Sequence, residues 1–229
     1  MKTLLNDFIS LIYPRLCIHC GKMLVKGEEY LCIHCECDLP RTAFHNENDN
    51  PVSRIFWGRV NVVNATSYLS YHKESITQKI IHAIKYHGEK ELGILMGKRF
   101  GIELNSCPIN QVDFIIPIPL HKLRLERRGY NQSECIAKGI AEAMNKPCFS
   151  ELIKRKVFTN TQTAKSRYDR WLNVEEVFEV SSPEKLINKH ILLVDDVITT
   201  GATIESCVTA LLKIEGCKIS VATLAYASN

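Results

Sequence analysis

The sequence predicts an α/β domain with an open, mostly parallel sheet flanked by helices, preceded by a small N-terminal zinc-binding module. Two observations predict the domain. Short, continuously apolar runs are typical of parallel strands covered on both faces, and apolar residues recur at helical spacing between these runs. The module is predicted by two C-x2-C pairs near the start of the chain. A chain of 229 residues can hold one medium domain with an ample core beside such a module.

Charge is distributed unevenly along the chain. The formal net charge is +4, but residues 117–170 contain twelve Lys and Arg against five Asp and Glu, a local +7 that leaves −3 for the remainder. A basic middle region suits a polyphosphate ligand, and it also suits nucleic acid or a solvated surface. Composition therefore excludes neither a small-molecule nor a nucleic-acid partner.

Residues 1–14 are predicted to form an amphipathic helix. The apolar run is short and is interrupted by Asn6 and Asp7, so we expect no transmembrane segment, and no small-residue cleavage site follows. Ten cysteines without a secretory signal indicate a reducing compartment, where grouped cysteines indicate metal before disulfide. We therefore expect a cytoplasmic protein whose first helix docks on the protein itself.

Two C-x2-C pairs separated by eleven residues predict a structural zinc site in a module that spans residues 1–45. The expected ligands are Cys17, Cys20, Cys32 and Cys35. Cys37 could replace Cys35, and His19 and His34 are spare potential ligands. A redox pair and a site that no longer binds metal are the alternatives.

The polar residues 42–54 are predicted to be a linker, and residues 55–229 to form the main domain. Strands are expected at residues 60–71, 113–118 and 191–194, and helices at 75–87, 90–103 and 133–144. Residues 154–173 have almost no apolar periodicity and are predicted to be a mobile hood over the site. A surface loop without function is the alternative for this segment.

A basic segment follows the strand at 113–118. Pro117 and Pro119 make the exit from this strand extended and rigid. The arginines beyond them supply planar, forked donors that suit phosphate, and Gly129 would let the backbone approach a ligand.

The run from Ile191 to Thr203, ILLVDDVITTGAT, carries the strongest functional signal. Asp195 and Asp196 stand at the carboxyl end of its apolar strand. The loop 199–203 should begin a helix, whose free N–H groups favour an anion. Two carboxylates beside such a loop are suited to a ribose and its phosphate.

Three other interpretations compete for this run. An ordinary polar turn before a capped helix would contain the same residue types. A Rossmann loop needs three spaced glycines, and this loop has only Gly201. A phospho-receiver domain begins with a similar strand, but 26 residues follow Thr203 and one βαβ unit alone takes about 30.

Several motifs occur in a fixed order along nearly the whole chain. They are the two cysteine pairs, Lys85-Tyr86-His87-Gly88, Pro117 to Leu120, Arg128 to Gln132, Thr161-Gln162 with Arg167 and Asn173, and Val194 to Thr203. Together they resemble the ComF family of competence protein F and GntX-like proteins. The resemblance implies a type I phosphoribosyltransferase fold with an N-terminal zinc finger, and in some members a role in DNA uptake and natural transformation.

The resemblance also implies a site for phosphoribosyl pyrophosphate (PRPP) with Mg²⁺. Asp195 and Asp196 would accept hydrogen bonds from the ribose hydroxyls and stabilise the sugar cation that forms as pyrophosphate leaves. The other implied PRPP-binding residues are Val197, Ile198, Thr199, Thr200, Gly201, Ala202 and Thr203, then Pro119, Leu120, His121 and Lys122 of the pyrophosphate loop, and Arg127 and Arg128 beside it. Mg²⁺ would bridge pyrophosphate and ribose oxygens and keep several waters.

The expected activity is transfer of the phosphoribosyl group to an acceptor, a glycosyltransferase reaction, and nothing in the hood identifies the acceptor. Two other classes of function stay open. The protein could sense PRPP without turning it over. It could also bind single-stranded DNA through the zinc finger and basic region, with Tyr130, Tyr168 and Trp171 as stacking partners. Single-stranded DNA and proteins of the competence machinery are therefore the expected partners besides PRPP.

Overall fold

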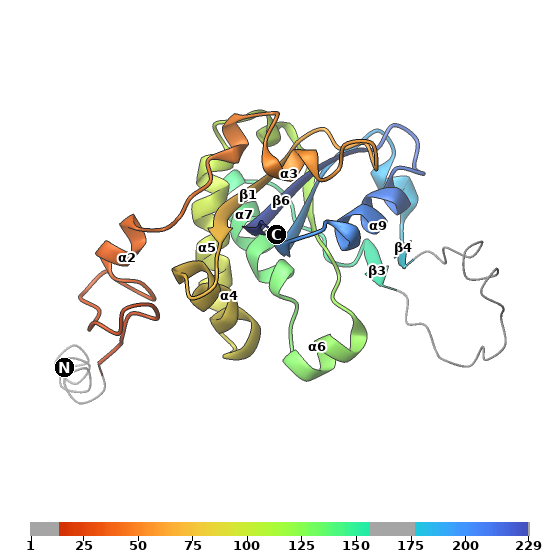
Figure 1. The fold of residues 1–229 in the computed structure, drawn as a ribbon. Helices are drawn as coiled ribbons and strands as arrows, with labels where there is room; N and C mark the ends of the chain where they lie inside the picture. Colours follow the sequence, from red (N-terminus) through yellow and green to blue (C-terminus); the bar gives the residue numbers. More distant parts are fainter. Residues whose placement is uncertain (1–13, 156–176, 229) are drawn as a thin grey trace, which may run out of the picture.

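The computed structural model describes residues 14–155 and 177–228, and its centre is a four-stranded parallel sheet in the order β1-β6-β5-β2 (Figure 1). The strands are β1 (Ala65–Tyr71), β6 (Lys218–Ala227), β5 (His190–Ile198) and β2 (Phe114–Pro117). In register, Leu193 of β5 pairs with Val221 on one side and Ile116 on the other. The predicted open parallel sheet is confirmed. Strand β1 begins later than expected, because Val60 and Val62 pack on the core rather than join the ladder.

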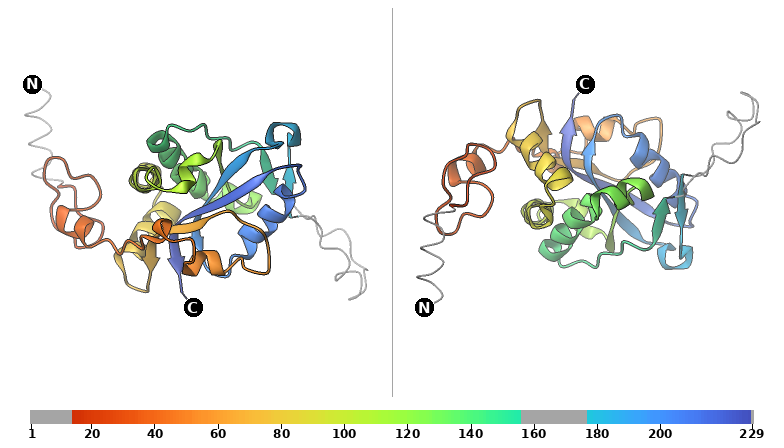
Figure 2. Two further views of the ribbon diagram at one scale, coloured as in Figure 1. Left: turned by 90° about the horizontal axis from the view of Figure 1, so that it is seen from above. Right: turned by 90° about the horizontal axis from the view of Figure 1, so that it is seen from below.

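Helices cover both faces of the sheet, and the pleat directs alternate residues to each (Figure 2). Ile191 and Leu193 belong to one apolar cluster, with α9 (Ala202–Leu211) and the short α3 (Pro51–Arg54). Leu192 and Val194 belong to the other, with α4 (Ile76–Tyr86), α5 (Lys90–Leu104) and α7 (Gln132–Met144). Because both faces are buried, β5 reads as a continuous apolar run.

Helices α5 and α7 cross at interlocking glycines. A Cβ atom on Gly97 of α5 would lie 2.1 Å from the carbonyl oxygen of Ile136, and one on Gly139 of α7 would lie 2.0 Å from that of Ile94. Only a residue without a side chain permits this backbone approach. The crossing fixes the position of α7, whose first turn reaches the carboxyl edge of the sheet.

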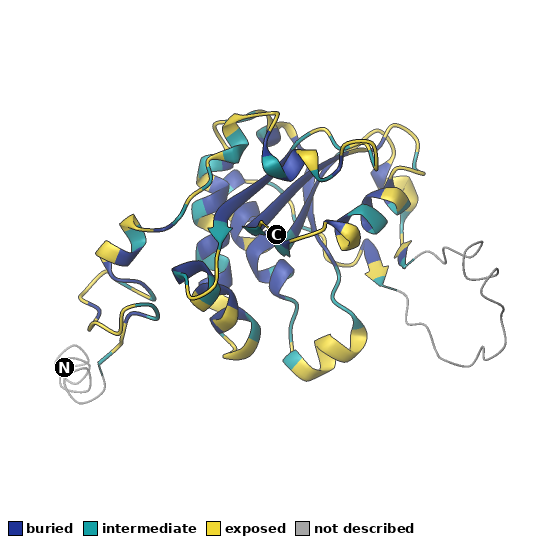
Figure 3. Ribbon diagram, in the orientation of Figure 1, coloured by how far each residue is buried: buried dark blue, intermediate teal, exposed yellow. Residues whose placement is uncertain are grey.

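Helix α6 (Lys122–Arg128) was not expected from the sequence. At its start, the backbone N–H of Leu123 donates to Nδ1 of His121 at 3.3 Å. The helix ends at Gly129, which adopts φ +78°. No residue of α6 is buried, and Figure 3 shows the helix almost wholly exposed. Apolar periodicity could not reveal it, because periodicity reports a buried face.

The segment predicted to be a linker carries structure of its own. It contains a short 3₁₀ turn (Phe44–Asn46) and α3, and Asn50 between them is 2% exposed. The Asn50 side chain accepts hydrogen bonds from the N–H groups of Val52 and Ser53 and donates to the carbonyl of Ala65. These residues therefore pack on the sheet edge, and the boundary between residues 1–45 and 55–229 remains a prediction.

The cysteine module packs against α4 and α5. Cys17, Leu24 and Leu31 share an apolar cluster with Ile80 and Ile84 of α4. Lys79 Nζ donates to the carbonyl of His19 at 2.8 Å, and Arg99 pairs with Glu36 at 2.6 Å. The module includes the five-residue helix α2 (Ile33–Cys37). The helix predicted over residues 1–14 lies almost wholly outside the described residues.

A two-stranded antiparallel hairpin of β3 (Ile153–Arg155) and β4 (Phe178–Val180) borders the domain. Nearly all of the predicted hood, residues 154–173, lies outside the described residues, and so do Tyr168 and Trp171. No helix among residues 14–155 and 177–228 is long and apolar enough to cross a membrane.

Candidate functional site

Four cysteine sulfur atoms converge in the N-terminal module. The Sγ atoms of Cys17, Cys20, Cys32 and Cys35 all lie within 4.8 Å of one another, and those of Cys20 and Cys32 are 3.6 Å apart. A zinc ion about 2.3 Å from each of four sulfurs holds them about 3.8 Å apart. The four ligands therefore fit structural zinc. Cys37 is exposed and lies outside this cluster.

The backbone of the module favours thiolate at one of these ligands. Burial opposes ionisation of Cys17, but the backbone N–H groups of Cys20, Cys32 and His19 outweigh it and lower the pKa of the Cys17 thiol to about 6. Hydrogen bonds from the backbone to sulfur are typical support for a closed zinc site with four cysteine ligands.

A cleft of about 290 Å³ lies at the carboxyl edge of the sheet, where open α/β sheets hold ligands. We call it the carboxylate cleft. Its walls come from the ends of β5 and β2, from α4, α6, α7 and α9, and from β3. The lining residues are Lys85, Ile118, Pro119, Leu120, Arg124, Arg128, Gln132, Ser133, Arg155, Asp195, Asp196, Val197, Thr199 and Thr203. Both carboxylates and residues of both predicted loops are therefore brought together here.

Asp195 is held by two donors on one oxygen. Its Oδ1 accepts the hydroxyl of Ser133 at 2.7 Å and the backbone N–H of Asp196 at 2.9 Å. Burial and the charge of Asp196 raise the pKa of Asp195 to about 7, although both hydrogen bonds and Lys85 act to lower it. The two adjacent carboxylates therefore differ in their surroundings.

Asp196 has a different partner. Its Oδ2 lies 2.9 Å from Nζ of Lys85, and the exposed fractions of the two side chains are 14% and 22%. Sequence reasoning missed Lys85 and Ser133 as site residues. Lys85 stands in one of the motifs that carry the family resemblance, whereas Ser133 has no sequence signal, because its role depends on how α7 crosses α5.

The loop after β5 leads into α9 through a glycine that the packing requires. Gly201 adopts φ +75°, and a Cβ atom there would lie 2.6 Å from Cγ2 of Ile55. Arg59 braces the same loop, because its guanidinium donates to the carbonyl of Thr200 at 2.9 Å and to Glu205. Neither Thr200 N–H nor Gly201 N–H donates to another described residue, so both can receive an anion at the helix start.

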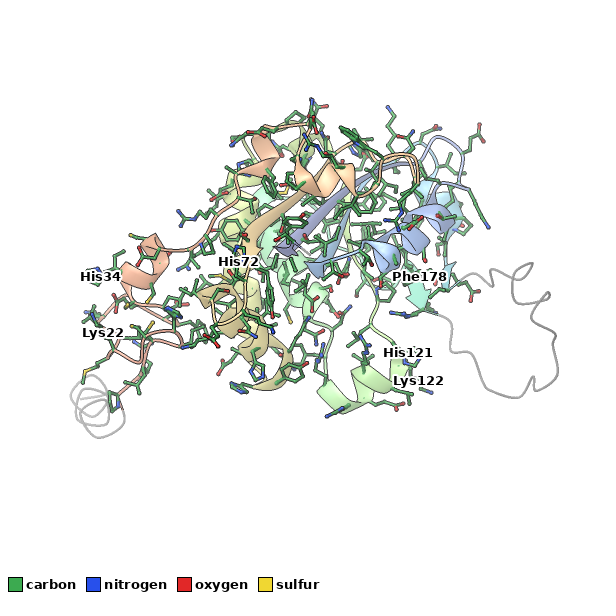
Figure 4. All side chains as sticks on the ribbon, viewed as in Figure 1. Lys22, His34, His72, His121, Lys122 and Phe178 are labelled. Atoms are coloured by element: carbon green, nitrogen blue, oxygen red, sulfur yellow. The ribbon has the colours of Figure 1, made fainter. Side chains whose placement is uncertain are left out.

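The remaining predicted residues lie either beside the loop after β5 or in and next to α6. Ile198 is 1% exposed, so only its backbone could serve a ligand, and Ala202 is the first residue of α9. His121 caps α6 and Lys122 begins it, far from Lys22 and His34 of the cysteine module (Figure 4). Neither His121 nor Lys122 lines the carboxylate cleft, and Arg127 lines only the neighbouring pocket.

The segment Gly129 to Ser133 joins the walls of the cleft. The hydroxyl of Tyr130 donates to the carbonyl of Ile84 at the end of α4, and Asn131 Nδ2 donates to the carbonyl of Ile118 at 2.9 Å. Ser133 then reaches Asp195. A Cβ atom on Gly129 would have no neighbour within 4 Å, so this glycine ends α6 rather than allowing close backbone approach to another part of the chain.

A second hollow of about 560 Å³ adjoins the cleft, and we call it the basic pocket. It is lined by Lys85, Tyr86, Gly88, Arg124, Arg127, Arg128 and Tyr130. Tyr86 is 64% exposed, and the guanidinium of Arg128 lies 5.5 Å from its ring centroid. The four cations make this pocket a site for negative charge.

Comparison with known proteins finds one matching family model and several similar proteins. A family model described as "Phosphoribosyl transferase domain" matches residues 131–229, which include α7, β5, α9 and β6. The chain is 36% identical over 114 residues to competence protein F of Haemophilus influenzae, a match that covers 49% of this chain and 50% of that protein. It is 28% identical over 225 residues to the DNA utilization protein YhgH of Escherichia coli O157:H7, covering 89% and 93%.

Among solved structures, the chain is similar to a glutamine PRPP amidotransferase from B. subtilis complexed with ADP and GMP. The TM-score is 0.44 at 18% identity, with 62% of this chain and 30% of that chain covered.

Proposed function

The chain belongs to the ComF family of proteins with a phosphoribosyltransferase-like domain, and we propose that this domain binds PRPP and transfers its phosphoribosyl group. One observation carries the proposal. Asp195 and Asp196 share a cleft with the start of α9 and with four cations, Lys85, Arg124, Arg128 and Arg155. Sugar hydroxyls, a terminal phosphate and a pyrophosphate each find matching groups there.

Each part of PRPP has partners in the proposed complex. Asp195 Oδ2 and the carboxylate of Asp196 accept hydrogen bonds from the ribose hydroxyls. The backbone N–H groups of Thr200 and Gly201, with the hydroxyls of Thr199 and Thr203, receive the 5′-phosphate. The pyrophosphate then points toward the cations. The carboxylates and the phosphates of the ligand provide the oxygen donors that Mg²⁺ prefers, and the ion would supply further neutralisation of the pyrophosphate.

In the proposed reaction, the bond between C1′ and the pyrophosphate oxygen breaks and the acceptor forms a bond to C1′. The electron pair leaves with pyrophosphate, so positive charge develops on the sugar. Two carboxylates beneath the ring stabilise this charge, and such preorganised groups contribute about 3 kcal/mol each in other enzymes.

Calorimetry with PRPP and Mg²⁺ tests the binding step. Replacing both Asp195 and Asp196 by Ala should abolish the binding heat, while the zinc content and the circular dichroism spectrum stay those of the unmodified protein. Glu142→Ala is the matched control, because it removes a carboxylate that pairs with Lys98 on the surface. Undiminished binding in the double variant would refute the proposed site.

Release of pyrophosphate tests the transfer step. The protein is incubated with PRPP, Mg²⁺ and a panel of nucleobases and nucleic acids, and release above the acceptor-free rate supports transfer. Binding without release from any acceptor would support a sensing function instead.

A second candidate is binding of single-stranded DNA, which the basic pocket favours because it combines four cations with the exposed ring of Tyr86. The DNA-related names of the relatives are consistent with a role in DNA uptake, which we propose on that ground. Fluorescence polarisation with a labelled oligonucleotide should show affinity that falls as salt rises. Tyr86→Ala should weaken it, whereas Tyr71→Ala, outside the pocket, should not. Binding that is absent at low salt would exclude this candidate.

A further inference from the structure

Lys85 lies at the boundary between the carboxylate cleft and the basic pocket and lines both. We infer that Lys85 exchanges partners: it neutralises Asp196 in the free protein and moves to the pyrophosphate group when PRPP binds. The inference rests on the proposed function, because the exchange requires PRPP as the ligand. It assigns a ligand-binding role to Lys85 of α4, a helix of which no other residue lines the cleft.

The backbone that carries Lys85 is fixed. Ile80 and Ile84 of α4 are buried in the core, and the carbonyl of Ile84 accepts the hydroxyl of Tyr130. Nearer the start of α4, Lys79 donates a hydrogen bond to the carbonyl of His19 in the cysteine module. Because the helix is held at several points, a change of partner by Lys85 requires only rotation of its own side chain.

The chemistry of lysine suits such an exchange. An ammonium group is a compact charge with three donors on a flexible four-carbon stem, so it can serve either of two anions at different directions. In the free protein it satisfies a largely buried carboxylate, which would otherwise be costly to leave unpaired. When ribose hydroxyls donate to Asp196, that carboxylate gains new donors, and the pyrophosphate offers Lys85 more negative charge.

The neighbouring cations do not occupy the same position. Arg124 and Arg128 also line both hollows, but neither forms an ion pair with a carboxylate of the described residues, and Arg128 stacks over Tyr86. They can receive pyrophosphate without giving up an ion pair. Of the four cations that line the cleft, Lys85 is the one whose nitrogen forms an ion pair with a carboxylate of the site, that of Asp196.

Two ligands separate the two roles of Lys85. Calorimetry with PRPP and with ribose 5-phosphate, both with Mg²⁺, compares a ligand that carries pyrophosphate with one that lacks it. Lys85→Met should weaken PRPP binding about tenfold or more, the effect of losing one charge-assisted hydrogen bond, and should weaken ribose 5-phosphate less than about threefold. Lys85→Arg should recover only part of the PRPP affinity, since a planar fork on a stiffer group cannot serve both anions. Lys98→Met is the matched control, because it also breaks a pair between lysine and a carboxylate but outside the cleft, and it should leave both affinities unchanged.

The outcomes are distinguishable. If the unmodified protein binds no PRPP, the proposed function itself fails and the inference falls with it. If the unmodified protein and Lys85→Met bind PRPP equally well, Lys85 does not contact pyrophosphate and the inference alone is overturned. Equal weakening of PRPP and ribose 5-phosphate would also overturn it, because Lys85 would then act only by supporting Asp196. Lys85→Met leaves Asp196 unpaired and should therefore lower the melting temperature, so the fold is checked by a circular dichroism spectrum and a zinc content equal to those of the unmodified protein.

Discussion

Replacing Gly201 by Ala should destabilise the protein through two separable effects. The backbone at this position has φ +75°, where an L-residue costs about 1–2 kcal/mol. The new Cβ would also lie 2.6 Å from Cγ2 of Ile55, about 1 Å inside a normal carbon contact of about 3.5 Å. Overpacking of this kind costs about 1–3 kcal/mol. Adding the two ranges gives an expected loss of about 2–5 kcal/mol.

Gly129→Ala provides the matched control. Gly129 adopts φ +78°, yet nothing lies within 4 Å of a Cβ placed there, so its replacement should cost only the backbone contribution of about 1–2 kcal/mol. Urea denaturation of both variants and of the unmodified protein measures the difference. The clash with Ile55 should make Gly201→Ala the less stable variant by about 1–3 kcal/mol.

A double-mutant cycle identifies the contact. Because Ile55→Ala removes Cγ2, it should cancel much of the loss in the Gly201→Ala background, with a coupling of about 1 kcal/mol or more. Equal destabilisation by Gly201→Ala and Gly129→Ala, together with no coupling to Ile55, would refute the close packing of this loop against the residue that ends α3.

Three further predictions concern the crossing, the carboxylates and the metal. Gly97→Ala should lower stability by about 3 kcal/mol in urea denaturation despite the better helix propensity of alanine, because its Cβ meets a backbone carbonyl that cannot rotate away; a neutral effect would contradict the tight crossing. Burial raises the pKa of Asp195 in the folded protein to about 7, whereas an unperturbed Asp has a pKa of about 4. Ionisation of Asp195 therefore lowers the free energy of unfolding as pH rises from about 4 to 7. Asp195→Asn should make the protein more stable than the unmodified protein by about 2–4 kcal/mol at pH 8 and change its stability little at pH 4. Asp113→Asn should do the opposite at pH 8, because the backbone N–H of His190 lowers the pKa of Asp113, and a loss of stability in both variants would count against this account. Metal analysis should find about one zinc per chain, lost in Cys20→Ser and kept in Cys37→Ser; loss of zinc in Cys37→Ser would mean that Cys37, not Cys35, is the fourth ligand.

The parts of the fold that the sequence predicts are those that depend on local pattern. The apolar run 191–194 predicts a buried strand, because both faces of β5 are covered, and the two C-x2-C pairs predict the sulfur cluster, because ligand spacing is set by local turns. The sequence does not predict helix α6, because none of its residues is buried and it therefore lacks the apolar periodicity of a packed helix.

The partners of the carboxylates could not be predicted in the same way. Ser133 and Asp195 are 62 residues apart in sequence, and their hydrogen bond depends on where the glycine crossing places α7. Lys85 reaches Asp196 because Tyr130 and the core hold the end of α4. Sequence spacing carries no record of these tertiary contacts, which is why the sequence predicts site residues after β5 and β2 but not Lys85 of α4 or Ser133 of α7.

The five residues from Gly129 to Ser133 make three attachments in succession, to α4, to the exit of β2 and to Asp195. Inserting or deleting one residue within this segment would move every attachment after that point out of register. The adjoining helix α6 has no buried residue and could lengthen or shorten by a turn without disturbing them. Length variation among natural relatives should therefore concentrate in the α6 region and be absent between Gly129 and Ser133, so that evolution can alter how far the positive surface extends while the spacing of the cleft stays constant.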